Sequence, residues 1–258
     1  MNLKALKPFR FIIMVLVLVS MACLCSDFLT TPEPEATPVE TEPPQAPEQP
    51  QEEETEPPSE PSEPSASSAQ EFFREEFEGD LSNWAQYVDS NGTEGNTKEA
   101  DISVEDGRLV FDFGKWLIGY IFYEPFEYTD VRIDVGFENR GTNVNNVLLF
   151  CRFSDEGHYL VNIASSGLYK INAFDGSKGV YAKIADGGST KIRPGKESNE
   201  FGLVCRDRDL ILYINGVETR RYTDNLFVFR KGLVGFGVAS EDQVPVKLEF
   251  DWVEISEP

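Results

Sequence analysis

From Glu71 onward, apolar and polar residues alternate with a period of two in one short run after another. In the clearest run, Val131, Ile133, Val135 and Phe137 alternate with polar or small residues. Successive side chains of a strand point to opposite faces, so this run predicts a strand with one buried face and one face in water. We expect further strands in the segments 109–113, 116–122, 147–153, 159–164, 168–174, 200–205, 210–214, 217–222, 233–239 and 246–255.

The runs are separated by dipeptides that favour tight turns. Asn215-Gly216 is the strongest of these signals, because a two-residue turn of type I′ needs positive φ at both positions. No stretch long enough for a helix combines a helical period with capping residues. About ten to twelve short strands at this spacing predict an all-β fold, a two-sheet antiparallel jelly-roll β-sandwich.

The first 25 residues have the pattern of an export signal. Lys4, Lys7 and Arg10 precede an apolar run over 11–22 that contains no charged residue. A membrane-spanning helix needs about 20 apolar residues, and this run is shorter. We therefore expect a cleaved signal segment over 1–25, with an uncleaved apolar anchor as the alternative.

The apolar run ends in Val19-Ser20-Met21-Ala22-Cys23, which resembles the lipobox of bacterial lipoproteins. The resemblance implies that Cys23 is acylated and becomes the N-terminus after cleavage. Ser20 stands where the lipobox usually has Leu, so an ordinary signal-peptidase site is a second alternative. Under the leading interpretation the protein lies outside the cytoplasm, at the cell membrane or cell surface, and meets the membrane only through this lipid.

Residues 26–70 have the composition of a disordered stalk. Eleven of the 16 prolines lie within 31–64, together with eleven glutamates. The same stretch has no aromatic residue and one large aliphatic residue, Val39, so it cannot bury enough apolar surface to offset the entropy of ordering. We predict a Pro/Glu-rich linker over 26–70 and a folded domain over 71–258.

The negative net charge of the chain makes two classes of partner unfavourable, nucleic acids and acidic lipids. The chain has a formal net charge of −22, and the predicted domain has 33 acidic against 20 basic residues. Phosphate backbones repel such a surface, so nucleic-acid binding is disfavoured. Acidic lipid headgroups are poor partners of the domain for the same reason.

Two cysteines lie within the domain. An exported domain folds where disulfides persist, so Cys151 and Cys205 either form a bridge or are two buried free thiols. Each shares its parity with apolar residues of its own run, which directs both side chains to the interior.

Six segments follow one another in a distinctive order: FREEFEGDLSNW (73–84), VEDGRLVF (104–111), LLFCRFSDEGHYLVNIASSGLYKI (148–171), FGLVCRDRDLILYINGVETRRY (201–222), GLVGFGVAS (232–240) and LEFDWVEI (248–255). Their order and spacing resemble the concanavalin-A-like lectin/glucanase superfamily, in particular its family-16-glycoside-hydrolase-like and 3-keto-disaccharide-hydrolase-like bacterial domains. Relatives carry cysteines in the two strands that match Cys151 and Cys205. The resemblance therefore favours the bridge, which we predict between adjacent strands.

The family includes glycoside hydrolases, whose catalytic glutamates stand in a strand reading Glu-x-Asp-x-x-Glu. The nearest segment here is 132–138, with Asp134 as the central acid, and Arg132 and Phe137 stand where glutamates are required. Retaining hydrolysis needs a pair of carboxylates, so the sequence does not support this catalysis. The single histidine, His158, follows polar residues in a turn, and we expect it to be solvated.

Sugar-binding relatives use the concave sheet, where aromatic faces meet pyranose rings and planar polar groups meet hydroxyls. The resemblance implies candidate ligand-binding residues in the strands that match the groove, with packing or solvation as the alternative role for each. These candidates are Trp116, Arg152, Tyr159, Asn162 and Tyr169.

Related sandwiches join their terminal strands through a structural calcium ion. By that analogy, Glu78 or Asp80 together with Asp251 are candidate calcium ligands, since hard cations take oxygen ligands. No other cofactor is expected.

Taken together, these features predict a surface-displayed, non-catalytic module that binds a carbohydrate or another extracellular ligand and is tethered to the cell envelope. Two alternatives remain at the level of the sequence. One is a structural or adhesion domain without a small-molecule site, and the other is a glycoside-hydrolase-like enzyme.

Overall fold

The computed structural model describes residues 69–258. The signal segment 1–25 with its lipidation site Cys23, and residues 26–68 of the predicted stalk, lie outside the described residues. Those expectations stay predictions. Within 69–258, no helix is long and apolar enough to cross a membrane.

Strands make up most of residues 69–258, and the only helical element in this range is a single 3-10 turn, Thr97–Glu99. The strands are β1 (Phe73–Glu75), β2 (Trp84–Ser90), β3 (Ala100–Glu105), β4 (Arg108–Phe113), β5 (Leu117–Tyr128), β6 (Val131–Asn139), β7 (Asn145–Ser154), β8 (Gly157–Ala164), β9 (Leu168–Asp175), β10 (Val180–Gly188), β11 (Ser198–Arg206), β12 (Asp209–Ile214), β13 (Val217–Thr223), β14 (Gly232–Ser240) and β15 (Val246–Ser256).

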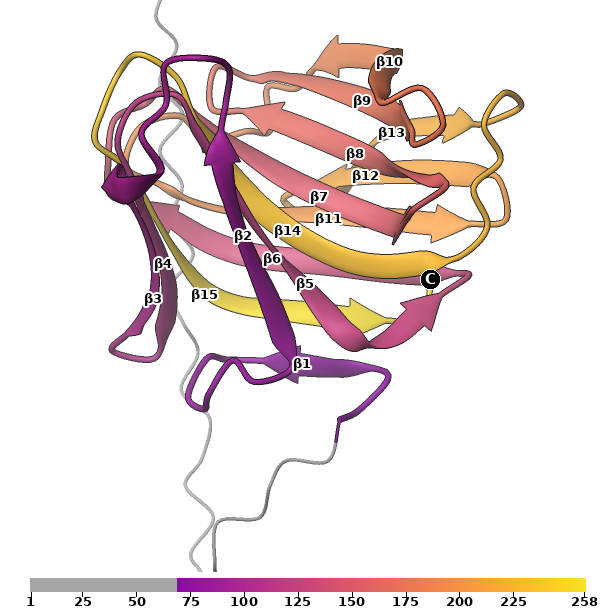
Figure 1. Ribbon diagram of the computed structural model, residues 1–258, viewed down its shortest axis with the longest axis horizontal. Coiled ribbons are helices and arrows are strands. Elements are labelled where there is room, and N and C mark those ends of the chain that lie inside the picture. Colours follow the sequence, from indigo (N-terminus) through magenta and orange to yellow (C-terminus); the bar gives the residue numbers. More distant parts are fainter. Residues whose placement is uncertain (1–68) are drawn as a thin grey trace, which may run out of the picture. The chain divides into compact units, whose positions relative to one another are not determined.

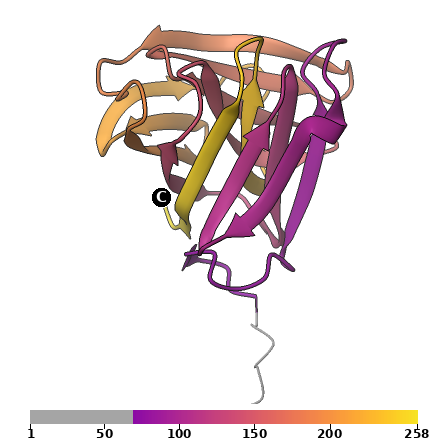
Figure 2. The same cartoon turned by 90° about the vertical axis from the view of Figure 1, so that its left-hand side faces the viewer.

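The strands form two antiparallel sheets (Figure 1). Sheet A has the order β13-β12-β11-β6-β15-β4-β3, and β1 pairs with β15. Sheet B has the order β10-β9-β8-β7-β14-β5-β2 and is turned towards the viewer in Figure 1. Figure 2 shows the same strands from the side of β3 and β4. The predicted all-β, two-sheet jelly-roll sandwich is therefore confirmed.

The core lies between the two sheets and consists of alternate side chains from both. Val131, Ile133 and Val135 of β6 are at most 1% exposed, as their alternation predicts. Their neighbour Arg132 lies on the opposite face of the strand and is partly exposed. The hairpin between β12 and β13 has positive φ at Asn215 (49°) and at the following glycine (76°), which confirms the predicted turn.

A disulfide joins Cys151 to Cys205 across the core, with 6.6 Å between the two Cα atoms. The predicted bridge is confirmed, but its expected place between adjacent strands was wrong. Cys151 lies on β7 of sheet B and Cys205 on β11 of sheet A. Each faces inward from its own sheet, so the bridge links the two layers of the sandwich instead of two neighbours within one layer.

Four strands were not expected from the sequence: β1, β2, β3 and β10. Three of them, β2, β3 and β10, are the outermost strands of their sheets. A terminal strand is covered on less of its surface, so its apolar alternation is weak, and β10 is mostly exposed or half-buried along its length. The chain therefore has more strands than the ten to twelve predicted.

Candidate functional site

The outer face of sheet B is apolar at its centre, where a strand that faces water would normally be polar. Its buried members form a second cluster, separate from the main core and surrounded by partly buried apolar side chains. The buried members are Phe122, Leu148, Phe150, Leu160 and Ala239. Directly opposed residues of paired strands share a face, so the register places all five on the outer side.

Glycines of the central strand β14 give this face its shape. Gly235 is paired with Phe122 on one side and Phe150 on the other, and Gly237 is paired with Tyr120 on one side. A Cβ atom on Gly235 would lie 2.6 Å from a ring carbon of Phe122, and one on Gly237 would lie 2.7 Å from Cβ of Tyr120. The absence of side chains on β14 therefore lets rings from the flanking strands lie close to its backbone.

An unbroken row of aromatic rings crosses sheet B from edge to edge. We call it the aromatic belt, and its members are Tyr87, Tyr120, Phe122, Phe150, Phe153, His158, Phe174 and Tyr181. Neighbouring ring centroids lie 5.9 Å apart for Tyr87 and Tyr120, 4.1 Å for Phe122 and Phe153, and 4.8 Å for Phe174 and Tyr181.

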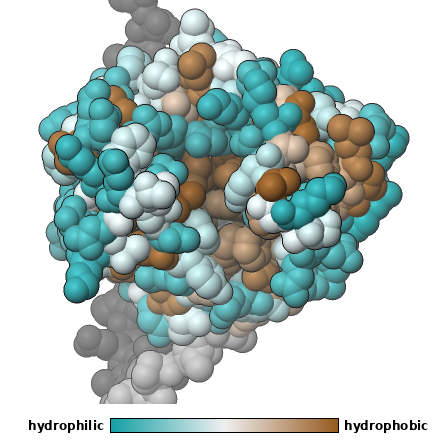
Figure 3. All heavy atoms as spheres, turned by 45° about the horizontal axis from the view of Figure 1, so that its top comes forward, coloured by the Kyte–Doolittle hydropathy of each residue, from teal (hydrophilic) through white to brown (hydrophobic). Residues whose placement is uncertain are grey.

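The belt is closed in its middle and open at its two ends. Phe122 is fully buried, whereas Tyr87 on the edge strand β2 is 50% exposed and Tyr181 on the edge strand β10 is 53% exposed. The face seen in Figure 3 has a hollow with apolar side chains on its floor and a mainly polar rim. The belt therefore has a half-exposed tyrosine at each end and closely packed, largely buried rings between them.

Few acidic side chains lie on this face, and one of them, Glu241, follows β14 and accepts a hydrogen bond from the outward Asn146 at 3.3 Å. The register places Asp89 of β2 and Asp186 of β10 outward, at opposite edges of the sheet. Six strand spacings separate these strands, about 29 Å along a flat sheet. Asp186 accepts a hydrogen bond from Lys183 at 2.7 Å, and this contact lowers the pKa of its carboxyl. The outward positions of β5, β14 and β7 between these edges, from Ile118 to Phe122 on β5 and their partners, carry no acid.

His158 belongs to the belt and is not the solvated turn residue that the sequence suggested. It is 4% exposed, and its ring lies against Phe153 and Phe174 at centroid distances of 4.8 and 5.1 Å. Its Nε2 lies 3.0 Å from Oη of Tyr181. Burial among these rings lowers its pKa to about 4, because a charged imidazolium would lose its hydration.

One predicted ligand-binding residue lies on this face, and a second lies in the segment just before one of its strands. Asn162 of β8 is half-buried and directly opposed to Leu148 and Lys170, which places it on the outer side. Trp116 lies just before β5, is half-buried and has a positive φ of 56°. Its carbonyl accepts from the backbone of Asn91 at 2.7 Å.

Arg152 was expected in the groove but is 1% exposed and points inward. The pairing of β7 with β8 shifts between Cys151 and Ser154, and Arg152 has a positive φ of 57° in this bulge. Its guanidinium donates to the carbonyls of Thr129 and Phe229 at 3.0 and 2.9 Å. The bulge therefore reverses the face on which this side chain lies.

Tyr159 and Tyr169 were also expected in the groove, and both belong to the main core. Tyr159 Oη donates to Asp224 at 2.6 Å and accepts from the backbone of Phe229 at 3.1 Å. These bonds fasten the segment between β13 and β14. Tyr169 is directly opposed to Ile163 of β8, whose side chain is in the core, so it shares the inner face.

The calcium candidates have other partners in the structure. Asp251 accepts from Arg108 Nε at 2.9 Å, and Asp80 accepts from the backbone of Ser82 at 3.0 Å. Within residues 69–258 no group of three or more His, Cys, Asp or Glu side chains is placed to hold a metal ion. The calcium site through Glu78 or Asp80 and Asp251 stays a prediction.

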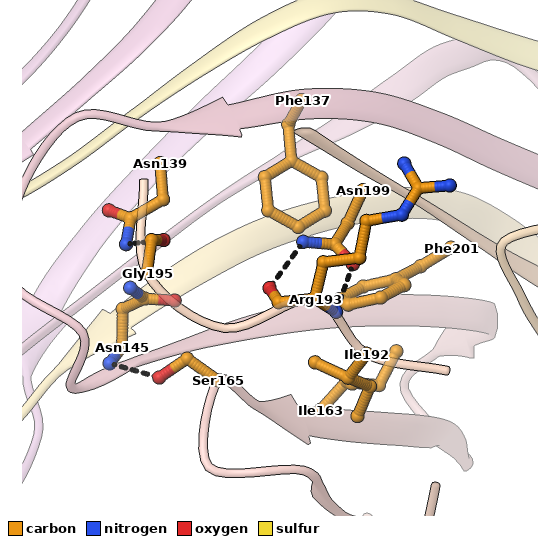
Figure 4. Close-up of a pocket in the computed structure, with 10 residues that line it drawn as sticks. All are labelled: Phe137, Asn139, Asn145, Ile163, Ser165, Ile192, Arg193, Gly195, Asn199 and Phe201. Atoms are coloured by element: carbon orange, nitrogen blue, oxygen red, sulfur yellow. Dashed lines mark hydrogen bonds between the residues drawn. The ribbon is translucent and has the colours of Figure 1, made fainter. Parts of the chain in front are cut away.

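A second hollow lies at one end of the sandwich (Figure 4). Its lining combines apolar side chains with amides: Phe137, Asn139, Asn145, Ile163, Ser165, Ile192, Arg193, Gly195, Asn199 and Phe201. The amide of Asn199 is bonded to the backbone of Arg193 at both ends, at 2.9 and 3.0 Å. The cavity measures about 10 Å³, which is room for one water molecule. It is therefore too small to be a ligand site.

The sequence signal for the belt was incomplete. Tyr120 and Phe122 stand in a run that was recognised, and the glycines of GLVGFGVAS could have indicated a close approach of rings. Tyr87 and Tyr181, the two accessible platforms, lie on strands that the alternation did not reveal.

No protein-family model matches the sequence, and no curated protein matches it. Solved structures do match the fold. A protein of unknown function with a galectin-like fold from Bacillus subtilis has a TM-score of 0.55 and 12% identity, over 72% of this chain and 94% of its own. A β-glucanase from Bacillus licheniformis has a TM-score of 0.53 and 11% identity, over 74% of this chain and 100% of its own.

An endo-β-1,3-glucanase from Pyrococcus furiosus has a TM-score of 0.51 and 13% identity, over 72% of this chain and 93% of its own. At these identities the likeness concerns the fold alone. The described domain has the concanavalin-A-like jelly-roll fold that family 16 glucanases also have.

Proposed function

We propose that residues 71–258 form a non-catalytic module that binds a carbohydrate on the outer face of sheet B. Residues 1–70 would export this module and tether it to the cell envelope through a lipid on Cys23. The observation that carries the proposal is the aromatic belt, with an accessible tyrosine at each end. Pyranose rings have apolar faces that stack on such rings, and several solved proteins of this fold are glucanases.

Polar groups beside the belt supply partners for hydroxyls. Asn162, Lys170 and Asn172 are outward on β8 and β9, next to one another in the register. Amides both donate and accept, and lysine donates. A sugar that stacks on the belt would therefore meet hydrogen-bonding groups at its edge.

The non-catalytic part of the proposal rests on the placement of acids. Glycoside hydrolysis uses two carboxyl groups about 5 to 10 Å apart on either side of the scissile bond. On the outer face of sheet B the register places Asp89 and Asp186 at opposite edges, and the third acid, Glu241, is hydrogen-bonded to Asn146 at the end of β14. The strand with Asp134, which the sequence indicated as nearest to the glucanase motif, belongs to sheet A.

The test is a panel of soluble oligosaccharides and polysaccharides incubated with the full-length chain and examined for both affinity and products. We expect binding without products. Tyr87→Ala and Tyr181→Ala should each weaken binding about tenfold, as the loss of one aromatic contact does. Val104→Ala is the matched control, because Val104 is a partly exposed apolar residue on β3 of sheet A.

Two results would contradict the proposal. Product formation that disappears when Asp89 or Asp186 is changed would show an enzyme. Failure of every glycan to bind would favour a structural or adhesion domain. The anchor is tested separately, by mass spectrometry of detergent-extracted protein for a diacylglycerol group on Cys23.

A further inference from the structure

His158 leaves one of its two ring nitrogens without a hydrogen-bond partner. Nε2 is hydrogen-bonded to Tyr181, but Nδ1 is buried and has no hydrogen-bond partner within residues 69–258. A neutral imidazole has one donor and one acceptor nitrogen. Whichever tautomer is present, one polar atom stays unpaired, and such atoms are rare in folded proteins.

The surroundings of His158 restrict what could pair with Nδ1. Its neighbours on β7 and β9 are the uncharged rings of Phe150, Phe153 and Phe174, and Tyr181 faces it from β10. Among residues 69–258, the hydrogen-bond and ring contacts of His158 are made by uncharged side chains, which favours a neutral ligand over an ionic one. A hydroxyl group fits either tautomer because it both donates and accepts.

Tyr181 is the most exposed member of this cluster. It lies on β10, an edge strand that pairs only with β9 and has a register shift between Lys183 and Ala185. Its ring is half exposed, and one hydrogen bond holds it to His158. A movement of this side chain leaves the main core between the sheets undisturbed, since Tyr181 is not part of it.

We propose that His158 and Tyr181 form a hydroxyl-binding subsite at the β10 end of the aromatic belt, with Tyr181 as its movable cover. A sugar hydroxyl binds Nδ1 of His158 while the sugar ring stacks on Tyr181. This inference rests on the proposed function. It assigns different roles to the two ends of the belt. The β10 end recognises hydroxyls, whereas Tyr87 at the β2 end provides a stacking surface.

The chain has a single histidine, so ¹⁵N-labelled histidine gives one pair of ring signals. The experiment adds cellohexaose and laminarihexaose, and any sugar from the panel that binds, to the labelled full-length chain. We expect the Nδ1 signal to move as the sugar saturates the protein. His158→Phe, which keeps a ring in the stack, should lower affinity about tenfold, the effect of one hydrogen bond at the upper end of its usual range.

Val180→Ala is the control for a change on β10, because Val180 is as exposed as its neighbour Tyr181 and is not one of the rings of the subsite. It should bind as the unchanged protein does. Sugar binding with an unmoved Nδ1 signal and undiminished affinity of His158→Phe would overturn the subsite and leave the proposed function standing. An Nδ1 signal that is already that of a bonded nitrogen before sugar is added, and then stays constant, would indicate a buried water and also overturn it. Failure of all sugars to bind would overturn both proposals.

Discussion

The outer faces of the two sheets have the same strand architecture but different chemistry. On sheet A, charged side chains are paired with one another: Arg108 contacts Glu249 and Asp251 at 2.9 Å each, and Arg140 contacts Glu138 at 2.7 Å. On sheet B, the corresponding positions carry the aromatic belt and the glycines of β14. The outer face of sheet A therefore carries charged side chains that are paired with one another. The outer face of sheet B carries aromatic rings and one buried polar atom without a partner in the described part of the chain, Nδ1 of His158.

The aromatic residues of the two faces show the same contrast. Trp252 on sheet A lies over Gly136, and the guanidinium of Arg74 covers its ring at 4.0 Å from the centroid. The hollow beside it measures about 280 Å³ but has no free aromatic face from this residue. Tyr87 and Tyr181 on sheet B are about half exposed. Tyr87 and Tyr181 therefore leave ring surface open on sheet B, the side of the proposed sugar site, whereas the ring of Trp252 on sheet A is covered.

The largest loss of stability is expected when the disulfide that links the two sheets is removed. Replacing Cys151 and Cys205 together with serine should lower the free energy of unfolding by about 4 kcal/mol, because a long loop is no longer closed in the unfolded chain. Urea unfolding of the variant and the unchanged protein measures this loss. Equal stability of the two proteins would show that the bridge does not restrict the unfolded state.

The second largest loss of stability is expected at acidic pH, because the belt contains a buried histidine. The pKa of His158 is about 4 in the folded chain, against about 6.5 unfolded. The unfolded chain therefore binds more protons between these values, and stability falls as pH drops from about 6.5 to 4. The loss from this residue should reach about 3 kcal/mol below pH 4.

Unfolding of His158→Phe at pH 7 and pH 4 isolates that contribution. The variant should lose about 3 kcal/mol less than the unchanged chain over this range, since phenylalanine binds no proton. Among the ionisable side chains of residues 69–258, Tyr181 is the one hydrogen-bonded to His158, through Nε2, and burial raises the pKa of Tyr181 to about 12. An identical acid loss in both proteins would mean that His158 titrates normally.

The same two faces show which side chains the alternation along the sequence places on the correct side of a strand. The alternation in β6 placed its inward residues correctly, because a central strand is buried on one side along its whole length. Period two also shows that Tyr159 and Asn162, three residues apart, lie on opposite faces of β8, so one of them had to be wrong. The resemblance to the family nevertheless implied that both residues lie in the groove.

Other errors were not accessible from pattern alone. Arg152 has the parity of Leu148 and Phe150, and only the bulge with its positive φ turns it inward. The burial of His158 depends on rings from β7, β9 and β10 that are far apart in the sequence. Such contacts follow from sheet order and register, which alternation does not specify.

A smaller effect is expected from adding one methyl group to a glycine on each face. A Cβ on Gly237 of sheet B would lie 2.2 Å from the backbone carbonyl of Gly119, which cannot move away. A Cβ on Gly136 of sheet A would clash with the indole ring of Trp252, a half-buried side chain that must be displaced together with the guanidinium of Arg74 over it. Gly237→Ala should cost about 2 kcal/mol of stability and also weaken sugar binding.

Gly136→Ala should cost about 1 kcal/mol, less than Gly237→Ala because side chains and not a backbone carbonyl have to move, and should leave sugar binding unchanged. Thermal unfolding together with the sugar-binding assay measures both variants. Equal costs for the two would mean that the outer face of sheet B has as much room to adjust as that of sheet A.

The smallest effect is expected from the ion pairs of sheet A. Arg108 contacts three acids, and its strongest partner Glu249 also accepts from Arg140 at 3.1 Å. Glu249 therefore keeps a cation when Arg108→Gln removes one, and exposed pairs contribute at most about 1 kcal/mol. The cost in stability should shrink further in about 1 M NaCl, where the screening length is about 3 Å.

Sugar affinity should not change in Arg108→Gln, because these residues lie on the opposite sheet from the belt. A loss of affinity in this variant, measured beside Tyr87→Ala, would place part of the binding surface on sheet A and remove the distinction between the two faces.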